Sequence, residues 1–235
     1  MNFLTAEWRK LVLANYAIDQ EVLKKYIPHQ TELDIWEDTC YISLVGFMFQ
    51  DTRLLGVKVP LHTTFEEVNL RFYVRYKEDK QWKRGVVFIK ELVPKTALTW
   101  VANTLYKEHY QTVPMNHHWL DKGDTLEVEY SWMYNKTPQF LKVIANNTLT
   151  DIAMDSEMEF ITEHYWGYTR ISKNKTFEYE VTHPRWQAYP VIGYKIDVDF
   201  GLVYGQDFGF INRLTPQSVM LAEGSKISVR NKKEI

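Results

Sequence analysis

Side chains of unlike hydrogen-bonding character share one face of a predicted strand. The segment 65–76 alternates strictly between apolar and polar residues, which is typical of a strand with two different faces. One face receives five apolar or aromatic side chains: Val68, Leu70, Phe72, Val74 and Tyr76. The other receives five polar ones: Glu67, Asn69, Arg71, Tyr73 and Arg75. An acid, an amide, a guanidinium and a phenol are more varied than an ordinary solvated strand face requires.

The chemistry of this polar face depends on where it points. If it points inward, Arg71 flanked by Asn69 and Tyr73 could hold a carboxylate in a bidentate clamp. Glu67 and Arg71 lie roughly 13 Å apart along an extended strand, so they cannot pair directly. If the face points outward, the same residues form cross-strand ion pairs in water. The residues alone leave both interpretations open.

Two later segments add candidate site residues. In the segment 183–186, His183 could be a general base or a ligand donor, and Trp186 could provide a stacking wall; the alternative is a histidine that stabilises a turn. In the segment 163–168, either His164 or Tyr165 could face a pocket. A regular strand would not direct both inward, and the sequence does not decide between them.

Lysine and metal chemistry have weaker support. Two lysines, Lys90 and Lys95, lie at the end of a predicted strand. Lys90 would be a Schiff-base nucleophile if it were desolvated, but lysines near strand ends usually reach solvent. Adjacent residues on a strand point apart, so His117 and His118 are poorly spaced for one metal ion. The chain contains none of the common nucleotide-binding, hydrolase or metalloprotease motifs. We therefore predict no cofactor and no metal.

Composition limits the class of protein. The chain has 235 residues, 45% of them hydrophobic and 25% charged, with a formal net charge of −2. This balance gives no electrostatic footprint for nucleic acid. Apolar runs are too short to span a membrane, and the N-terminus does not resemble a signal peptide, so the expected location is the cytoplasm. Cys40 is the only cysteine and is expected to be buried as a small hydrophobe.

The predicted elements are mostly strands in a single domain over residues 1–235. A short helix over residues 20–26 is expected to begin at the N-cap Asp19, and a longer one covers residues 96–110. Residues 33–36 and 40–49 are expected to form a hairpin, residues 51–64 a loop, and residues 223–225 a turn. Further strands are predicted over residues 11–18, 65–76, 85–93, 126–134, 141–150, 157–166, 177–181 and 194–198, several of them from alternation. The fold class is α+β, mainly antiparallel β, with one or two helices.

Several segments resemble one bacterial family of unknown function, the YqjF-like proteins. Residues 65–74 resemble its F-x-E-x-N-x-R-x-Y-V strand, and residues 85–88 its next strand. Residues 160–168 are similar to its later F-L-T-E-R-Y-x-x-Y segment, and residues 183–186 resemble its His-x-x-Trp turn. The matches keep the family's order and extend from about residue 8 to residue 229.

The resemblance implies a fold similar to acetoacetate decarboxylase, a curved antiparallel sheet or barrel that encloses a cavity. The strand from Glu67 to Tyr73 would then line that cavity. The decarboxylases use a Schiff-base lysine in a Pro-Lys-Lys segment, preceded by Gly-Arg-Glu. The corresponding region here ends at Thr112-Val113-Pro114-Met115-Asn116, with neither feature. This departure argues against decarboxylation through an imine.

Three functional hypotheses follow. The first is a small-molecule-binding protein whose cavity takes an oxygenated or carboxylated metabolite. In it Arg71 clamps the anion, Glu67, Asn69 and Tyr73 orient it, and Tyr165 and Trp186 contribute to the wall. The second is a lyase or hydrolase with Glu67 or His183 as general acid or base. The third is an interaction protein whose exposed aromatic residues meet a partner or a second copy of the chain.

Overall fold

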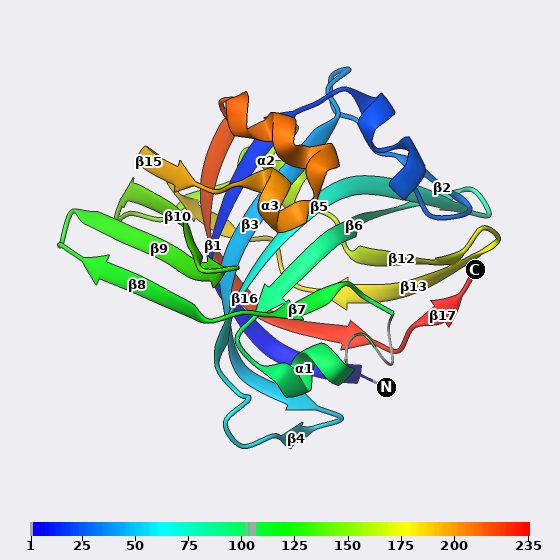
Figure 1. The fold of residues 1–235 in the computed structure, drawn as a ribbon, viewed down its shortest axis with the longest axis horizontal. Coiled ribbons are helices and arrows are strands. Elements are labelled where there is room, and N and C mark those ends of the chain that lie inside the picture. The colour runs from blue at the N-terminus through cyan, green and yellow to red at the C-terminus, as the bar shows by residue number, and fades with distance from the viewer. Residues whose placement is uncertain (1, 102, 104–106) are drawn as a thin grey trace.

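Strands form most of the computed structural model, which describes residues 2–101, 103 and 107–235 (Figure 1). Within these residues, thirteen strands belong to one large sheet and four to a smaller one. The large sheet contains β1 (Asn2–Ala17), β2 (Thr31–Leu33), β3 (Tyr41–Leu54), β4 (Val57–Lys58), β5 (Phe65–Glu78), β6 (Gln81–Val93), β7 (Tyr110–Thr112), β11 (Thr150–Asp151), β12 (Trp166–Ser172), β13 (Lys175–Thr182), β14 (Gln187–Tyr189), β16 (Ser218–Arg230) and β17 (Lys233–Glu234). The smaller sheet contains β8 (Met115–Asp121), β9 (Thr125–Tyr134), β10 (Thr137–Asn146) and β15 (Val191–Asp197).

Helices are short in the described part of the chain. Three are α-helical: α1 (Thr96–Val101), α2 (Glu157–Thr162) and α3 (Phe200–Tyr204). Three are 3₁₀ segments: η1 (Gln20–Val22), η2 (Lys24–Tyr26) and η4 (Gln206–Arg213). Asp19 caps η1 by accepting the Glu21 backbone N–H, as predicted. None of these helices is long and apolar enough to cross a membrane.

The large sheet curves back on itself. Its strand order is β11-β14-β16-β1-β3-β5-β6-β12-β13-β17, and β13 also pairs with β16. The pairs are antiparallel except β6 with β12 and β6 with β7, which are parallel. The sheet therefore has an inner and an outer face, and the prediction of a curved, mainly antiparallel sheet is confirmed.

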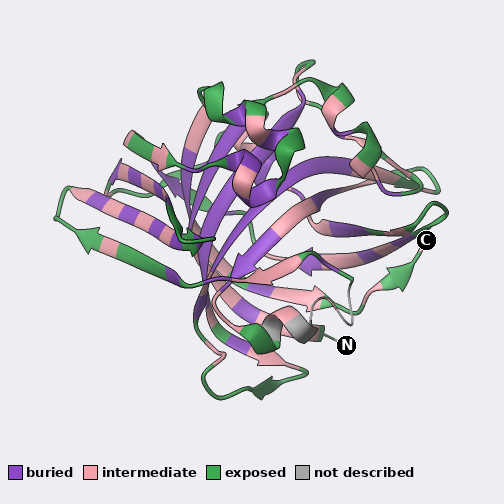
Figure 2. Ribbon diagram, in the orientation of Figure 1, coloured by how far each residue is buried: buried purple, intermediate pink, exposed green. Residues whose placement is uncertain are grey.

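The outer face packs against the smaller sheet and against α3 and η4. Val68, Leu70, Phe72 and Val74 of β5 join the same buried cluster as Val128 of β9 and further residues of β10, α3 and η4. Figure 2 shows this burial as bands of purple that alternate along β9 and β10. A second cluster, which includes Phe47, Phe65 and Trp186, occupies the inner face.

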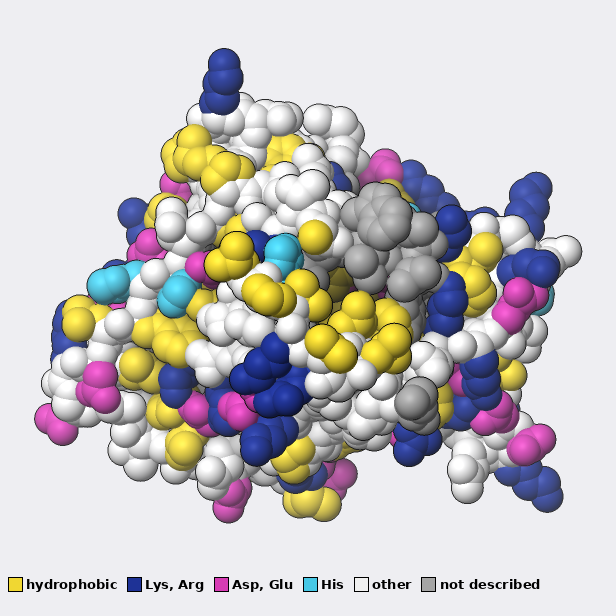
Figure 3. Space-filling model, turned by 90° about the horizontal axis from the view of Figure 1, so that it is seen from below, with side chains coloured by type: hydrophobic (Ala, Val, Ile, Leu, Met, Phe, Trp, Pro, Cys, Tyr) yellow, Lys and Arg dark blue, Asp and Glu magenta, His cyan; other side chains and the backbone are white. Residues whose placement is uncertain are grey.

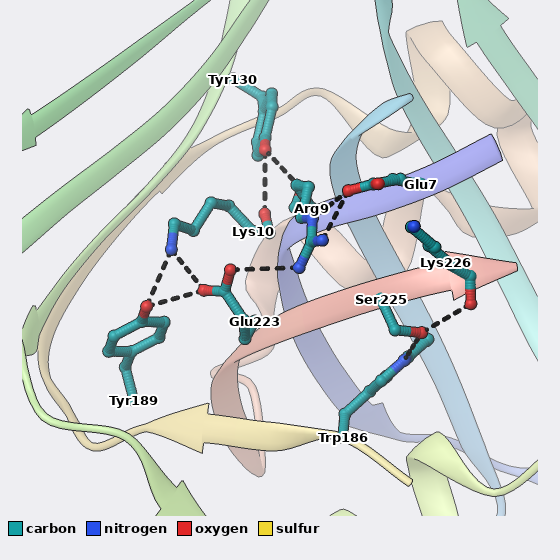
Figure 4. A network of polar contacts seen from close by, with 9 residues as sticks. All are labelled: Glu7, Arg9, Lys10, Tyr130, Trp186, Tyr189, Glu223, Ser225 and Lys226. Carbon is teal, nitrogen blue, oxygen red and sulfur yellow. Dashed lines mark hydrogen bonds and ion pairs between the residues drawn. The ribbon is translucent and has the colours of Figure 1, made fainter. Parts of the chain in front are cut away.

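A polar network ties β1, β9, β14 and β16 together (Figure 4). The ammonium of Lys10 pairs with Glu223 and donates to the Tyr189 hydroxyl at 2.8 Å. Tyr189 donates in turn to Glu223, at 2.6 Å. From the smaller sheet, Tyr130 donates to the Lys10 carbonyl at 2.9 Å. The network therefore fixes the place where the two sheets meet.

Three local predictions need correction. The hairpin predicted from residues 33–36 and 40–49 is reduced to an antiparallel bridge between Trp36 and Thr39, because residues 31–33 pair with β5. Residues 51–64 are not all loop, because β3 continues to Leu54 and pairs with β4. Residues 223–225 lie inside β16, where the positive φ of Gly224 bends the strand against β1. A Cβ at Gly224 would lie 2.0 Å from the Trp8 carbonyl oxygen. This close approach of the β1 backbone, rather than a turn, is the reason for a glycine at this position.

Two helix predictions also need correction. The segment 157–166 was expected to be a strand, but its first part forms α2 because Ser156 accepts the Glu159 backbone N–H at 3.2 Å. The helix predicted over 96–110 is present as α1 and at Asn103, which is also helical, but Tyr110 belongs to a strand. The predicted positions Ala102, Leu105 and Tyr106 lie outside the described residues. Cys40 is buried, as expected.

Candidate functional site

A pocket of about 220 Å³ lies against the inner face of β5 and β6. Its polar lining includes Glu67, Asn69 and Arg71 of β5, Glu91 of β6, Tyr110 of β7, and Glu108, which lies just before β7. The alternation of β5 places three of these side chains inward while their neighbours fill the outer cluster. The polar face of β5 therefore meets the pocket along Glu67, Asn69 and Arg71.

Arg71 is a buried cation that makes no direct ion pair with another described residue. Only 8% of the residue is exposed. Among the described residues, its guanidinium has no ion pair, and its buried Nε has no hydrogen-bond partner. Its nearest aromatic contact is the Tyr73 ring, whose centroid lies 5.8 Å from the guanidinium carbon. A charge in this position is costly unless a partner compensates it.

Glu67 is held by two donors. The Asn69 amide donates to one carboxylate oxygen at 2.9 Å, and the Tyr110 hydroxyl donates to the other at 3.1 Å. Burial raises the pKa of Glu67 to about 7, although these two hydrogen bonds and the charge of Arg71 oppose the shift. Its carboxyl therefore exchanges a proton near neutral pH.

Glu91 and Glu108 place two more carboxyls in the pocket. Burial, followed by the charges of Glu108 and Glu67, raises the pKa of Glu91 well above its usual value. Burial raises the pKa of Glu108 to about 7, although hydrogen bonds from Thr169 and Tyr179 oppose the shift. The Thr169 hydroxyl donates to Glu108 at 2.6 Å.

A β-bulge decides which residues of β6 reach the pocket. Arg71 pairs with Phe88, but Leu70 pairs with Lys90, so β6 has one extra residue at this point. Phe88 and Glu91 both line the pocket although they are three residues apart. Lys90 instead donates to the Tyr134 hydroxyl at 3.0 Å and to the Val203 carbonyl, away from the pocket.

His164, rather than Tyr165, faces the pocket. Its Nε2 lies 3.0 Å from Asp34, which also accepts from the Nε of Arg84 at 2.6 Å. Burial lowers the pKa of His164 to about 4, so the ring is neutral at pH 7. Burial alone would raise the pKa of Asp34, but its hydrogen bonds with His164 and Arg84 lower it. The neutral His164 thus donates from Nε2 and keeps Nδ1 as an acceptor.

Aromatic residues form the opposite wall. His183 and Trp186 stack with ring centroids 4.2 Å apart, and Trp8 packs against Trp186 at 6.3 Å. The Trp186 indole donates to the Ser225 hydroxyl at 2.9 Å, which fixes the ring (Figure 4). Burial lowers the pKa of His183, whose Nδ1 lies 2.9 Å from the Pro184 carbonyl.

The pocket extends toward the face that carries the N-terminus, α1 and β4 (Figure 1). Val59 and His62, which follow β4, belong to its lining. Figure 3 shows hydrophobic side chains gathered in the middle of this face. Four of the described residues near β4 are exposed hydrophobics: Leu55, Val57, Val59 and Leu61.

Other predicted site residues lie elsewhere. The Tyr73 hydroxyl is 2.7 Å from Ser43, and Tyr73 is not part of the lining. Tyr165 donates to Glu163 and is also outside the lining. Lys95 is absent from the lining, and no described lining residue is a lysine. His117 lies 2.6 Å from Glu66, and the described residues contain no group of metal-ligating side chains.

Buried polar atoms without partners are concentrated at the pocket. Most such atoms in native proteins are satisfied, so each exception needs an explanation. Among the described residues, six lining side chains contribute one: Trp8 Nε1, Thr52 Oγ1, Asn69 Oδ1, Arg71 Nε, Glu91 Oε2 and His164 Nδ1. These donors and acceptors surround one space and are suited to a small polar ligand.

Comparisons with known proteins agree with the architecture. A family model described as an uncharacterized conserved protein, DUF2071, matches residues 5–226. The uncharacterized protein YqjF of Bacillus subtilis is 25% identical over 181 residues, which cover 76% of this chain and 72% of that protein.

Two groups of solved structures share the fold. The acetoacetate decarboxylase of Legionella pneumophila has a TM-score of 0.63 at 10% identity, covering 100% of this chain and 90% of its own. The enduracididine biosynthesis enzyme MppR, with HEPES bound, has a TM-score of 0.71 at 11% identity. The match covers 100% of this chain and 88% of the MppR chain. Another structure of MppR is complexed with pyruvate. These likenesses show an acetoacetate-decarboxylase-like fold.

Proposed function

Since the chain belongs to the DUF2071 family of uncharacterized conserved proteins, we propose that its pocket binds a small carboxylated or otherwise oxygenated metabolite. Arg71 holds the anionic group of this ligand. The unpartnered acceptors of Asn69 and His164 receive hydrogen bonds from hydroxyl or other donor groups of the ligand, and Glu67 holds Asn69 in place. Trp186 and His183 close the aromatic wall.

The observation that carries this proposal is the buried guanidinium of Arg71, which makes no ion pair with another described residue. Removing one partner of a buried ion pair typically costs about 3–5 kcal/mol, because the remaining charge is uncompensated. An anionic ligand would supply the missing partner and accept from the Nε and Nη atoms in a bidentate arrangement. The binding of pyruvate by MppR, a protein of the same fold, is consistent with a small acid as the ligand.

The pocket volume limits the size of the ligand. An engineered apolar cavity of about 150 Å³ accommodates benzene. At about 220 Å³, the pocket suits a compact acid, or one with a single ring, rather than a long lipid.

A thermal-shift screen tests this function. Small carboxylates, oxo acids, phosphates and neutral analogues are compared on the wild-type protein and on Arg71→Met. A ligand that binds only the native state raises the melting temperature. At a free ligand concentration of one hundred times the Kd, the free energy of unfolding increases by about 2.7 kcal/mol. We expect at least one carboxylate to stabilise the wild type and to lose this effect in Arg71→Met.

Arg75→Met is the matched control for this screen. Arg75 lies on the same strand but is paired with Glu32 at 2.7 Å and packs on the Trp82 ring. The Arg75→Met protein should keep the ligand-induced shift. Equal shifts in Arg71→Met and wild type would contradict the proposed clamp.

A lyase or hydrolase remains a second candidate function, because Glu67 and His183 line the same pocket. A neutral His183 is suited to accept a proton, and Glu67 exchanges one near pH 7. Turnover of a ligand found in the screen, abolished by His183→Gln without loss of binding, would favour this candidate. Full turnover in the variant would exclude His183 as the acid or base.

A further inference from the structure

Three buried carboxyls and two phenols form one cluster on the pocket side of β5, β6 and β13. Glu67, Glu91 and Glu108 each line the pocket, as do Tyr110 and Tyr179. Their charges influence one another: Glu67 and Glu108 both act on Glu91, and all three act on Tyr110. Such a concentration of acids in an apolar pocket is unusual for a purely structural purpose.

Charge balance requires this cluster to retain protons. Arg71 is the only arginine, and no lysine is present, among the described lining residues. Three carboxylates beside one guanidinium would leave two uncompensated negative charges in a buried site. Like charges in close contact do not all ionise, and one carboxyl keeps its proton at a pH where another has lost it.

The hydrogen bonds assign different roles to the acids. Glu67 accepts from Asn69 and Tyr110, which favours its carboxylate form. Glu91 has an oxygen without a partner in the described residues, and burial and the charges of the other two acids raise its pKa against the opposing hydrogen bond of Tyr110. Glu91 is therefore the carboxyl that keeps a proton and can donate it into the pocket.

The register brings these acids within reach of a ligand on Arg71. Glu91 pairs across the strands with Asn69, which is two residues from Arg71, or about 7 Å along the strand. Glu67 is two residues further in the same direction on the same face. Arg71, Glu67 and Glu91 line one pocket, so a ligand whose carboxylate is bound by Arg71 lies in the same space as both acids.

We propose that Glu67 and Glu91 act as a base and an acid that enolise a small 2-oxo acid whose carboxylate is held by Arg71. This inference rests on the function proposed above and extends it to a reaction. Glu67 takes a proton from C3, and the electrons of the C3–H bond form the C2–C3 double bond. The electrons of the carbonyl π bond move to the C2 oxygen, which takes the proton of Glu91. The product is the enol, and reversal after exchange of the protons with solvent returns the labelled oxo acid.

This step needs no group beyond those that line the pocket. Neither an oxidant nor a co-reactant is consumed, because the oxo acid and the enol have the same composition. The unionised carboxyl opposite the base stabilises the developing oxyanion in an apolar site. Glu108 acts through its charge on Glu91 and is a positioning residue.

Deuterium exchange tests the proposal. Pyruvate and 2-oxobutanoate are incubated with the protein in deuterated buffer, and loss of the C3 proton signal is followed by NMR. We expect exchange above the buffer rate in the wild type, and a loss of about 100-fold or more in Glu91→Gln and in Glu67→Gln. Melting-temperature shifts measured on the same samples report binding separately.

Glu180→Gln is the matched control for these variants. Glu180 lies on β13 outside the pocket lining and pairs with Arg230 at 2.9 Å, so this variant should exchange at the wild-type rate. Wild-type exchange no faster than buffer would overturn the inference, and the melting shifts would show whether binding survives. Full exchange in Glu91→Gln, or a lysine adduct trapped by borohydride, would also overturn it.

Discussion

At the scale of single residues, burial sets the charge state of the site. The Arg71 guanidinium keeps its charge in an apolar surrounding, and the carboxyls of Glu67 and Glu108 respond to the same burial by holding protons up to about pH 7. His164 responds in the opposite direction and stays neutral. The pocket thus combines one fixed cation with acids whose charge changes near physiological pH.

The raised pKa of Glu67 predicts a pH-dependent stability. Its pKa rises from 4.5 in the unfolded chain to about 7 in the folded protein, so the folded state binds more protons between these values. The stability that protonated Glu67 contributes is fully present below about pH 4.5 and is lost as the pH rises through 7. Glu67→Gln removes the titrating carboxyl and therefore this pH-dependent loss. In urea titrations, the free energy of unfolding of Glu67→Gln minus that of wild type should be larger at pH 8 than at pH 5.

The groups facing Glu67 are Arg71, Tyr110, Glu91 and Glu108, and all of them remain in this variant. Glu180→Gln provides the control, since Glu180 pairs with Arg230, which keeps its charge over this pH range, and does not line the pocket. A stability difference between Glu67→Gln and wild type that is the same at both pH values would contradict the raised pKa.

At the scale of the elements, a glycine positions one acid of the pocket. Gly167 of β12 pairs directly with Tyr179 of β13, and the Tyr179 ring lies over it. A Cβ at Gly167 would lie 2.1 Å from Tyr179 Cζ. Tyr179 in turn hydrogen-bonds Glu108. The strand pair β12–β13 therefore holds Glu108 through the ring of Tyr179.

Gly167→Ala should displace the Tyr179 ring. Overpacking of this kind typically costs about 1–3 kcal/mol, which urea unfolding can measure. The same substitution in a Tyr179→Ala background should cost much less, because the clashing ring is absent. If a double-mutant cycle shows no coupling energy between the two positions, the position of the Tyr179 ring does not depend on Gly167.

Local sequence patterns predicted the strands themselves better than they predicted which strands pair with each other. The alternation of residues 65–76 identified β5 and both of its faces, because that pattern depends only on the strand period. The pairing of β2 with β5 depends on contacts distant in sequence, which no local pattern contains. The helix α2 had an available signal, Ser156 followed three residues later by Glu159, the capping-box pattern.

Part of the site was hidden by an irregularity and by a wrong helix assignment. Strict alternation from Phe88 would direct Lys90 inward, whereas the bulge in β6 directs Glu91 inward instead. Glu108 and Tyr110 were assigned to a helix and so were not considered as pocket residues. Bulges and strand ends depend on the paired strand, so a single sequence does not reveal them.

At the scale of the whole molecule, the two faces of the large sheet have different tasks. Its outer face is apolar and packs against the smaller sheet, while its inner face carries the pocket. Leu141 of β10 is completely buried in the outer cluster. Stability and ligand binding should therefore be separable by substitutions on the two faces.

Leu141→Ala should test this separation. Leucine-to-alanine changes in a core typically cost about 2–5 kcal/mol of unfolding free energy. We expect a lower melting temperature but an unchanged ligand-induced increase, since the pocket lies on the other face. Leu120→Ala on the same small sheet, at a side chain that is 38% exposed, should cost little. Loss of the ligand response in Leu141→Ala would show that the faces are coupled.

The central claim is that Arg71 binds an anion, and the NMR signal of its Nε–H group tests this most directly. The signal can be assigned by its absence in Arg71→Met. The Nε atom has no partner among the described residues, so a bound carboxylate should shift the proton strongly downfield. Titration with a stabilising carboxylate is predicted to move this signal in proportion to occupancy. A carboxylate that stabilises the protein and leaves the Arg71 signal unchanged would contradict the account.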